Sequence, residues 1–326
     1  MRGKFRRRRK WLLAAMVAAM PAVFLAIPTG SANADPATVY MQDYPGDTGS
    51  TPSTPPDGNW WTSPDIVVCP TLAPCATDVP VVPGGTYYLD ITLRNPGRPV
   101  SGQLSLWVTD SSGASSWPGP WANFATIPDT LPAGVTTLTG IPWTAPSSVS
   151  PGGHFCLAAF WTSQTDLLTN NPNMQLEVRN NRNVVQHNVV MLDLQIGAHI
   201  PVLVNLRDPY PQPDKAGLIF VPSGQAPFIG PGTIVVDLGP ELGQRWIAAG
   251  APGSGIQRVG STQVRIVDPK QARIGGLTLN PGDDFQLSLD FAASSGAGNQ
   301  YTEELEQTDA KGNVDGGVEY RLAVQG

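Results

Sequence analysis

The sequence predicts an all-β protein: two tandem immunoglobulin-like β-sandwiches that follow a cleaved signal peptide. Glycine and proline are abundant, with 35 and 33 of the 326 residues. Short β-branched runs recur between clusters of turn residues, and no long stretch shows helical periodicity. This pattern is typical of sandwiches and barrels. About 290 residues follow the leader, which is enough for two ordinary domains.

Residues 1–34 have the character of an export signal. Seven basic residues precede an apolar run from Trp11 to Ile27, and Ala32-Asn33-Ala34 offers the small residues that a signal peptidase requires. The alternative is a membrane anchor, but the run is short and is interrupted at Pro21. Arg8-Arg9 resembles a twin-arginine signal only loosely, so the Sec and twin-arginine routes both stay open. We expect a secreted, extracellular protein without a stable membrane span.

Loss of the leader changes the charge balance. The leader holds seven of the 20 basic residues and no acidic one, so 13 basic residues face 26 acidic residues, a net charge of −13. Affinity for nucleic acid needs concentrated positive charge, so this class of partner is excluded. The partners that we expect are an extracellular protein or a cell-wall or carbohydrate ligand.

The three cysteines suggest one local disulfide. Cys69 and Cys75 flank a tight loop with two prolines, and an exported protein meets an oxidising compartment, so we expect them to be bonded. Cys156 is left over, and its apolar neighbours suggest a buried, inert thiol. A metal site at Cys156 has poor support because no CxxC motif is present.

Residues 35–59 form an extended lead-in rich in Pro, Gly, Ser and Thr, with too little apolar surface to pack alone. The first sandwich is predicted over 60–195. Alternation predicts half-buried strands over 86–95 and 103–110, with Trp107 on the outward face, and a weaker strand over 136–143.

The strand at 154–161 is different because apolar residues lie on both of its faces. Phe155, Leu157 and Trp161 line one face, and Cys156 and Phe160 line the other. Both faces must therefore be covered, and we expect the second cover to come from the Trp60-Trp61 lead-in or from the second domain.

Alternation breaks down over 183–192, which suggests a bulge or a passage between two sheets. A short, stiff junction is expected near 193–197, followed by a second sandwich over 196–326. The clearest inward face there is 285–291, where every second residue is apolar. A last hairpin turns at 309–313, Gly316-Gly317 permits a bulge, and a short helix is suggested at 239–249.

Several motifs in fixed order resemble a known family. They are Trp60-Trp61-x-Ser63-Pro64-Asp65-Ile66, the turn Asn95-Pro96-Gly97, His154-Phe155-Cys156-Leu157-Ala158 and Asn181-x-Asn183-Val184-Val185-Gln186-x-Asn188-Val189. Together they resemble the immunoglobulin-like sandwiches of secreted bacterial proteins, in particular the cell-adhesion-related (CARDB-like) domain, over residues 60–195. The resemblance implies extracellular adhesion, or a spacer role beside a catalytic partner, and no active-site residues. An antibody-type cysteine partner for Cys156 is absent from the strand at 87–93.

Enzymatic motifs are weak or missing. The three histidines, His154, His187 and His199, have no metal-ligand spacing, and the sequence contains neither HExxH nor a Gly-x-Ser-x-Gly elbow. The carboxylate pairs 283–284 and 303–304 are neighbours on strands, so each pair points to opposite faces and cannot act together on a glycoside. We predict that the protein is not an enzyme and that it has no catalytic, cofactor-binding or metal-binding residues.

Calcium is the one ion that the sequence leaves open. Loop carboxylates and carbonyls suit it, and the candidates are Asn280-Pro281-Gly282-Asp283-Asp284 and Asp208 with Asp214. Solvated turn acids are the simpler interpretation and the favoured one.

The loop 117–124 carries the candidate ligand-binding aromatics Trp117, Trp121 and Phe124. Exposed rings held by proline and glycine make platforms for sugars or hydrophobic partners. The alternative, which we favour, is that they cap an open end of the sandwich.

The function predicted from sequence is a secreted, non-enzymatic binding, adhesion or scaffold module of the bacterial cell exterior. One alternative is a carbohydrate- or cell-wall-binding accessory module of an extracellular hydrolase. A weaker one is a hydrolase with a site between the domains.

Overall fold

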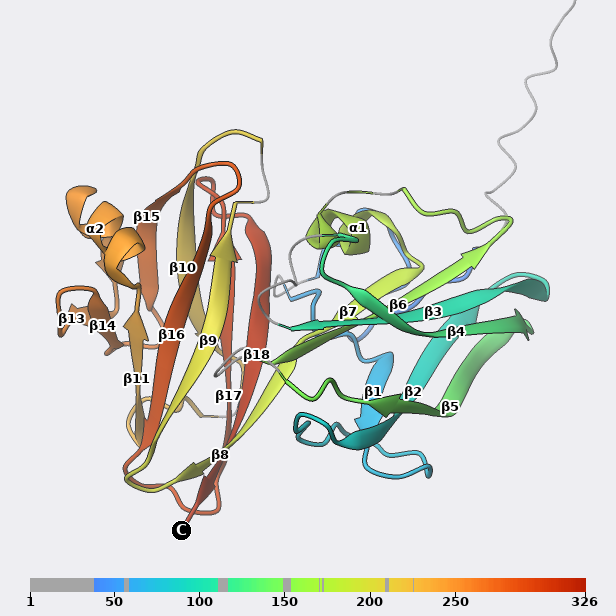
Figure 1. Ribbon diagram of the computed structural model, residues 1–326, viewed down its shortest axis with the longest axis horizontal. Coiled ribbons are helices and arrows are strands. Elements are labelled where there is room, and N and C mark those ends of the chain that lie inside the picture. Colours follow the sequence, from blue (N-terminus) through green and yellow to red (C-terminus); the bar gives the residue numbers. More distant parts are fainter. Residues whose placement is uncertain are drawn as a thin grey trace, which may run out of the picture. The chain divides into compact units, whose positions relative to one another are not determined.

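The computed structural model of the chain confirms the predicted β class. It describes residues 38–55, 59–110, 117–148, 154–169, 171, 173–208, 211–224 and 226–326. The predicted signal peptide, 1–34, lies outside these residues. The described strands form four sheets, two in each sandwich (Figure 1).

The first sandwich consists of a three-stranded sheet packed against a four-stranded sheet. One sheet has the order β1-β2-β5, with β1 (Ile66–Cys69), β2 (Thr86–Asn95) and β5 (Gly134–Thr144). The other has the order β4-β3-β6-β7, with β4 (Ala122–Leu131), β3 (Val100–Asp110), β6 (Phe155–Ser163) and β7 (Val184–His187). Neighbouring strands are antiparallel. Pairing of the second strand with the fifth and of the third with the sixth is the Greek-key order of immunoglobulin-like sandwiches.

The residues that alternation predicts to face inward form the core of the first sandwich. In β2, Tyr87, Leu89, Ile91 and Leu93 are buried, and in β3, Leu104, Leu106 and Val108 are buried. Trp107 points away from this core, as predicted, and packs on the outer face of the sheet. The disulfide between Cys69 and Cys75 is present, with an S–S distance of 2.06 Å.

Both faces of β6 are covered, as its sequence requires. Phe155, Leu157 and Trp161 belong to the core of the first sandwich. Cys156 and Phe160 face outward and lie in a second apolar cluster. That cluster also contains residues from the short helix α1 (Met174–Asn180) and the pair Trp60 and Trp61. The predicted cover by Trp60 and Trp61 is therefore confirmed. Helix α1 was not predicted, because its seven residues after Asn173 are too few for clear periodicity.

The lead-in packs against the first sandwich. Val39 and Met41 are buried in its core. Tyr40 forms an isolated antiparallel bridge with Arg94, and Met41 N–H donates to the carbonyl of Arg182 at 2.9 Å. These two apolar side chains therefore reach a core that the surrounding polar segment could not build alone.

The chain passes between the sandwiches at Asn188. β7 ends at His187 in the first sandwich, and β8 (Val189–Gln195) begins in a sheet of the second. This passage explains the loss of alternation that the sequence shows over 183–192. β8 pairs in parallel with β18 (Val314–Gln325), so the connection is a strand in a ladder (Figure 1). The strand precedes the predicted domain boundary at 195/196, and the domain limits stay a prediction.

The second sandwich consists of a six-stranded sheet packed against a five-stranded sheet. The first sheet has the order β12-β15-β10-β17-β18-β8, with β12 (Gly253–Ser254), β15 (Arg273–Leu279), β10 (Asp214–Pro222) and β17 (Gln300–Thr308) besides the two strands already given. The second has the order β13-β14-β11-β16-β9, with β13 (Ile256–Arg258), β14 (Gln263–Ile266), β11 (Gly232–Asp237), β16 (Asp284–Ala293) and β9 (His199–Arg207).

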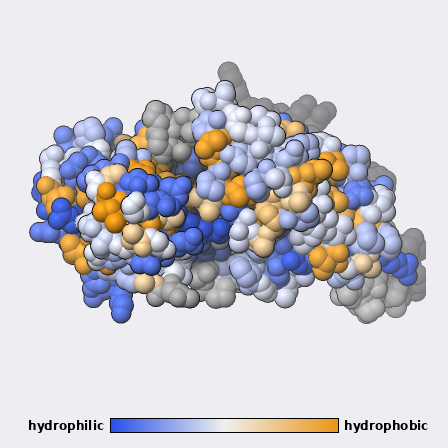
Figure 2. Space-filling view, turned by 90° about the horizontal axis from the view of Figure 1, so that it is seen from below, coloured by the Kyte–Doolittle hydropathy of each residue, from blue (hydrophilic) through white to orange (hydrophobic). Residues whose placement is uncertain are grey.

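Local predictions for this half are confirmed. Leu287, Leu289 and Phe291 of β16 are buried. The suggested helix is α2 (Pro240–Ala248). The final hairpin turns at 309–313, and the register of β17 against β18 shifts opposite Gly316. The face in Figure 2 shows hydrophobic residues in small separate groups among hydrophilic ones.

Candidate ligand pocket between the two sandwiches

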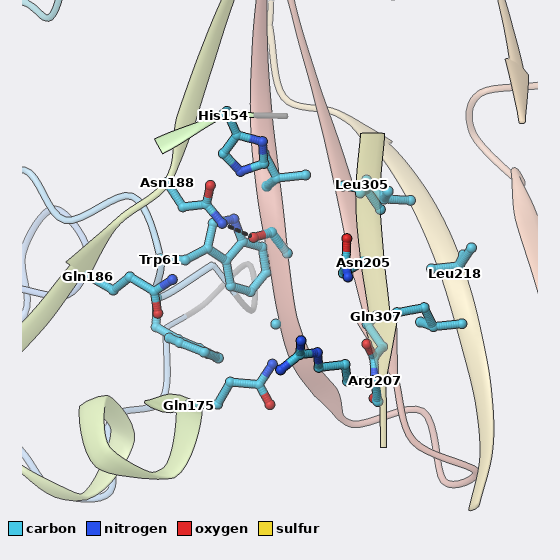
Figure 3. Close-up of a pocket in the computed structure, with 16 residues that line it drawn as sticks. Trp61, His154, Gln175, Gln186, Asn188, Asn205, Arg207, Leu218, Leu305 and Gln307 are labelled. Atoms are coloured by element: carbon cyan, nitrogen blue, oxygen red, sulfur yellow. Dashed lines mark hydrogen bonds between the residues drawn. The ribbon is translucent and has the colours of Figure 1, made fainter. Parts of the chain in front are cut away.

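A pocket of about 80 Å³ lies where the first sandwich meets the open end of the second (Figure 3). The first sandwich supplies side chains from the lead-in, from α1, and from the beginning of β6 and the end of β7. The second supplies the ends of β9 and β17 and the beginning of β18. The polar side chains that line it are His154, Gln175, Gln186, Asn188, Asn205, Arg207 and Gln307.

Trp61 forms one wall and holds the two halves together. Its indole is fully buried and lies against Gly317 of β18. Asn188 N–H donates to the carbonyl of Trp61 at 2.7 Å, and the Asn188 side-chain amide donates to the carbonyl of Gly317 at 2.9 Å. Next to it, the Asn59 amide donates to Glu304 Oε2 at 3.0 Å. The pocket wall is thus fixed by contacts from both sandwiches.

Several buried polar atoms in the pocket have no hydrogen-bond partner in the described part of the chain. They include Oε1 of Gln186, Oδ1 of Asn205 and Nε1 of Trp61. A buried polar atom without a partner costs about 1–3 kcal/mol. Such atoms therefore mark a place where water or a ligand completes the hydrogen bonds.

His154 lies at one end of the pocket as a neutral base. Burial lowers its pKa to about 4, and the Asn188 side chain and Asp110 only partly oppose this effect. Neither ring nitrogen meets hydrogen-bonding geometry with a described residue, although Asn188 is adjacent. At neutral pH the ring thus offers one N–H donor and one lone pair.

Across the pocket, Arg207 and Gln175 extend toward each other from opposite sides (Figure 3). Arg207 Nη2 is bound to Asp284 Oδ2 at 2.5 Å, and its carbonyl accepts the Gln307 side-chain amide at 2.7 Å. The positive charge is thus balanced by a carboxylate of the protein itself. The pocket therefore offers mainly neutral amide donors and acceptors.

An ion pair joins the two sandwiches beside the pocket. Asp78, in the loop after β1, binds Arg321 Nη1 of β18 at 3.0 Å and lies 3.3 Å from His187 Nε2. Burial would raise the pKa of Asp78, but His187, the backbone N–H of Val68 and Arg321 together hold it well below its usual value. Asp78 is therefore ionised and charge-assisted at neutral pH.

The structure separates the three candidate aromatics. Trp117 stacks on Phe160 with ring centroids 4.4 Å apart, and Trp121 is only 5 % exposed, so both belong to the outer cluster over β6. Phe124 packs toward the core of the first sandwich, 5.9 Å from Trp143. These positions match the alternative in which the rings cover the sheet, and their role in ligand binding stays a prediction.

Arginines occupy the main calcium candidates. Asp283 binds Arg245 Nη1 at 2.5 Å, while Asp284 binds Arg207. The two neighbouring carboxylates bind different arginines; only Asp284 lies on β16, whereas Asp283 lies in the preceding turn and not on a strand as the sequence suggested. Nowhere in the described ranges do three His, Cys, Asp or Glu side chains gather in a way that could hold a metal ion, Asp208 and Asp214 included.

The remaining cysteine is buried. Burial raises the pKa of the Cys156 thiol, which donates to Asn188 Oδ1 at 3.5 Å. It is a protonated, inert group at neutral pH, as its apolar neighbours predicted. Within the described residues, no helix is long and apolar enough to cross a membrane.

Comparison with known proteins gives no family. No protein-family model and no curated protein matches the chain, so the CARDB-like resemblance stays a prediction. Among solved structures, the collagen adhesin from S. aureus is 12 % identical, with 79 % of this chain and 91 % of that chain covered at a TM-score of 0.23. The CupB6 tip adhesin from Pseudomonas aeruginosa is 12 % identical, with coverages of 80 % and 99 % and a TM-score of 0.21.

A third similar structure is AvmM, which catalyses macrocyclization in alchivemycin A biosynthesis. It is 11 % identical, with 42 % of this chain and 84 % of that chain covered at a TM-score of 0.23. Adhesins and an enzyme thus stand at the same low similarity. These likenesses assign no function to this chain.

Proposed function

We propose that this chain is a secreted, non-enzymatic binding or adhesion module of the bacterial cell exterior, with its ligand site in the pocket between the sandwiches. One observation carries the proposal: a pocket built from both sandwiches contains buried amide oxygens of Gln186 and Asn205 that have no hydrogen-bond partner among the residues described. Groups of this kind are satisfied by a ligand that brings its own hydrogen-bond donors.

The chemistry of the lining favours a hydroxyl-rich ligand such as a sugar of the cell wall or the extracellular matrix. Amide side chains present a donor and an acceptor side by side, which matches the dual character of a hydroxyl group. Trp60 and Trp61 provide the aromatic part of the wall, and the second sandwich adds aliphatic side chains, namely Val204, Leu206, Leu218, Leu305 and Val318. The absence of any Lys, Asp or Glu from the described lining disfavours a strongly charged ligand.

The same lining disfavours the alternative of a hydrolase between the domains. Glycoside hydrolysis requires two carboxylates across the substrate, and nucleophilic catalysis requires an activated Ser, Cys, Thr or Lys. The described residues around this pocket include none of these groups. His154 alone could accept a proton, and a lone base provides no nucleophile and no oxyanion site.

Binding of purified protein without its leader to arrays of glycans and to insoluble cell-wall polymer tests the proposal. Asn205→Leu and Gln307→Leu, which remove polar groups from the pocket, should each reduce retention at least several-fold. Gln286→Leu, on β16 outside the pocket, is the matched control and should retain full binding. Retention that both pocket variants leave unchanged, or turnover of a glycan by the wild type, would contradict the proposal.

A further inference from the structure

A second cavity, of about 210 Å³, lies at the end of the first sandwich on the other side of His154. Its floor is formed by buried side chains of β1, β5 and β6, namely Val68, Trp143, Phe155 and Leu157. Its rim consists of the loop 79–83 and of Met191 and Leu192 on β8. This cavity is separate from the amide-lined pocket, and the function proposed above does not use it.

The cavity has the size of a small organic molecule. An engineered apolar cavity of about 150 Å³ stays dry and binds benzene, and this one is larger. Protein cores are otherwise packed nearly as densely as organic crystals, so a gap of this volume leaves many side-chain atoms without contacts. A ring-shaped apolar ligand would restore those contacts.

Two polar groups in the wall could orient a ligand within this cavity. The Nε1–H of Trp143 is buried without a hydrogen-bond partner among the described residues, and the Trp143 side chain is 2 % exposed. The His154 ring is also buried, and neither of its nitrogens meets hydrogen-bonding geometry with a described residue, although the Asn188 side chain is adjacent. A ligand with one hydroxyl group could accept from the indole N–H and donate to the imidazole, or do either alone.

The rim is held in place by the protein itself. Val79 N–H donates to the carbonyl of Val68 at 3.1 Å, Val82 N–H donates to the Tyr87 hydroxyl at 2.8 Å, and Gly85 N–H donates to the carbonyl of Val82 at 3.0 Å. The mouth is therefore preformed, and binding need not order a loop. Preformed sites lose less conformational entropy on binding.

The charged groups at the wall favour a neutral ligand. Asp78 and His187 line the cavity, and Asp78 is already paired with Arg321. An anionic ligand would lie close to the Asp78 carboxylate, and a cationic one would gain little from a carboxylate that is already neutralised. Either would also lose hydration on entering an apolar space.

We propose that this cavity binds a small neutral aromatic molecule with one hydroxyl group, with the ring between Leu157 and the Val79–Val81 rim and the hydroxyl group at Trp143 and His154. The phenol ring is the simplest member of this class. The site shares His154 with the proposed sugar pocket, but the variants that test it change only residues outside that pocket, so either proposal can fail alone.

Titration of the protein without its leader with p-cresol, and in parallel with toluene, tests the proposal by calorimetry and by ligand-observed NMR. We expect saturable binding of p-cresol with a Kd below about 1 mM. Toluene lacks the hydroxyl group and should bind about 3- to 10-fold more weakly. Absence of saturable binding, or equal affinity for both compounds, would overturn the proposal.

Two matched pairs of variants locate the site. Val81→Trp fills the mouth and should abolish binding, whereas Val82→Trp, at a side chain that is 58 % exposed, should not. Trp143→Phe removes the indole N–H and should weaken p-cresol about 3- to 10-fold. Trp161→Phe removes an equally unpartnered indole N–H outside the cavity and should leave affinity unchanged. Equal effects within either pair, in variants that still unfold cooperatively, would place the binding elsewhere and overturn the proposal.

Discussion

The indole of Trp61 lies directly against the Cα of Gly317. A methyl group added at Gly317 would stand 2.3 Å from Cζ2 of Trp61 and 2.6 Å from the carbonyl oxygen of Leu305. The first neighbour is a buried ring and the second is backbone, so neither can move aside cheaply. A glycine in β18 is therefore what allows the first sandwich to rest on the second.

Gly317→Ala should lower the free energy of unfolding by about 1–3 kcal/mol, because overpacking forces shifts in a dense interface. Urea denaturation followed by tryptophan fluorescence measures the change. Gly275→Ala, in β15, is the control, since its added methyl group would meet only atoms at 3.8 Å or more. Equal stability of the two variants would show that Trp61 does not press on Gly317 in solution.

Asp78→Asn should destabilise the protein by about 1–3 kcal/mol at pH 7, because it weakens the bond to the half-buried Arg321 and leaves the buried His187 beside a neutral amide. The depressed pKa of Asp78 means that this contribution is complete above the ordinary carboxyl pKa and is lost as pH falls below about 4. Denaturation curves of wild type and variant should therefore converge in acid. Asp129→Asn, on the edge strand β4, should change stability by less than about 0.5 kcal/mol.

Glu303 should make the protein less stable as pH rises from about 4.5 to 7. Burial raises its pKa to about 7, and the N–H of Phe228 at 2.6 Å opposes this only in part. The folded state then holds a proton that the unfolded state releases, so stability from this group is present below pH 4.5 and decreases up to pH 7. The loss corresponds to about 3 kcal/mol. Glu303→Gln should abolish this slope, and a slope that persists in the variant would assign it to another group.

Reduction of the Cys69–Cys75 disulfide should have a small effect. The bond closes a loop with a sequence separation of only 6 residues, and the loss of chain entropy predicts at most about 2 kcal/mol. Thermal melts with and without reductant measure it, with Cys69→Ala plus Cys75→Ala as the genetic equivalent. A loss well above this value would mean that the loop positions a larger part of the first sandwich.

Trp117→Ala should lower the free energy of unfolding by about 3 kcal/mol, because it uncovers Phe160 and removes the stacked ring. Trp117→Phe keeps an aromatic cover and should recover most of this loss. The predicted ligand role of Trp117 and Trp121 is tested on the same proteins. Loss of glycan retention in a stable Trp117→Phe variant would support it, and unchanged retention would contradict it.

Much of the fold could be predicted because β-strands encode their environment with a period of two. Alternation placed the buried faces of β2, β3 and β16, and the two apolar faces of β6 required a second cover, which Trp60 and Trp61 provide. β4 was missed because Pro128 and a mostly exposed edge position leave its pattern weak. α1 was missed because it has only two turns and depends on tertiary contacts.

The pocket could not be predicted from sequence. Asn188 and Gln307 line one cavity only because β8 pairs with β18, the neighbour of β17, and so brings the end of β7 to this sheet of the second sandwich. Amides so far apart form no linear motif, and each of them is ordinary in a strand. The aromatic loop 117–124 was a more visible signal, yet its rings mostly cover the protein's own sheet.

The parallel ladder between β8 and β18 determines how the two sandwiches respond to mechanical load. The chain leaves the first sandwich and enters a ladder that runs from Val189 to Gln195 beside Glu319 to Gln325. Tension along this connection would act along the strands, so the hydrogen bonds of the ladder would be loaded together in shear rather than opened one at a time. A bend at the junction would have to break other contacts, namely those that Trp61, Asn188 and Asn59 make with the second sandwich. The ladder, together with the contacts across the junction, therefore makes the connection between the two sandwiches resistant to extension.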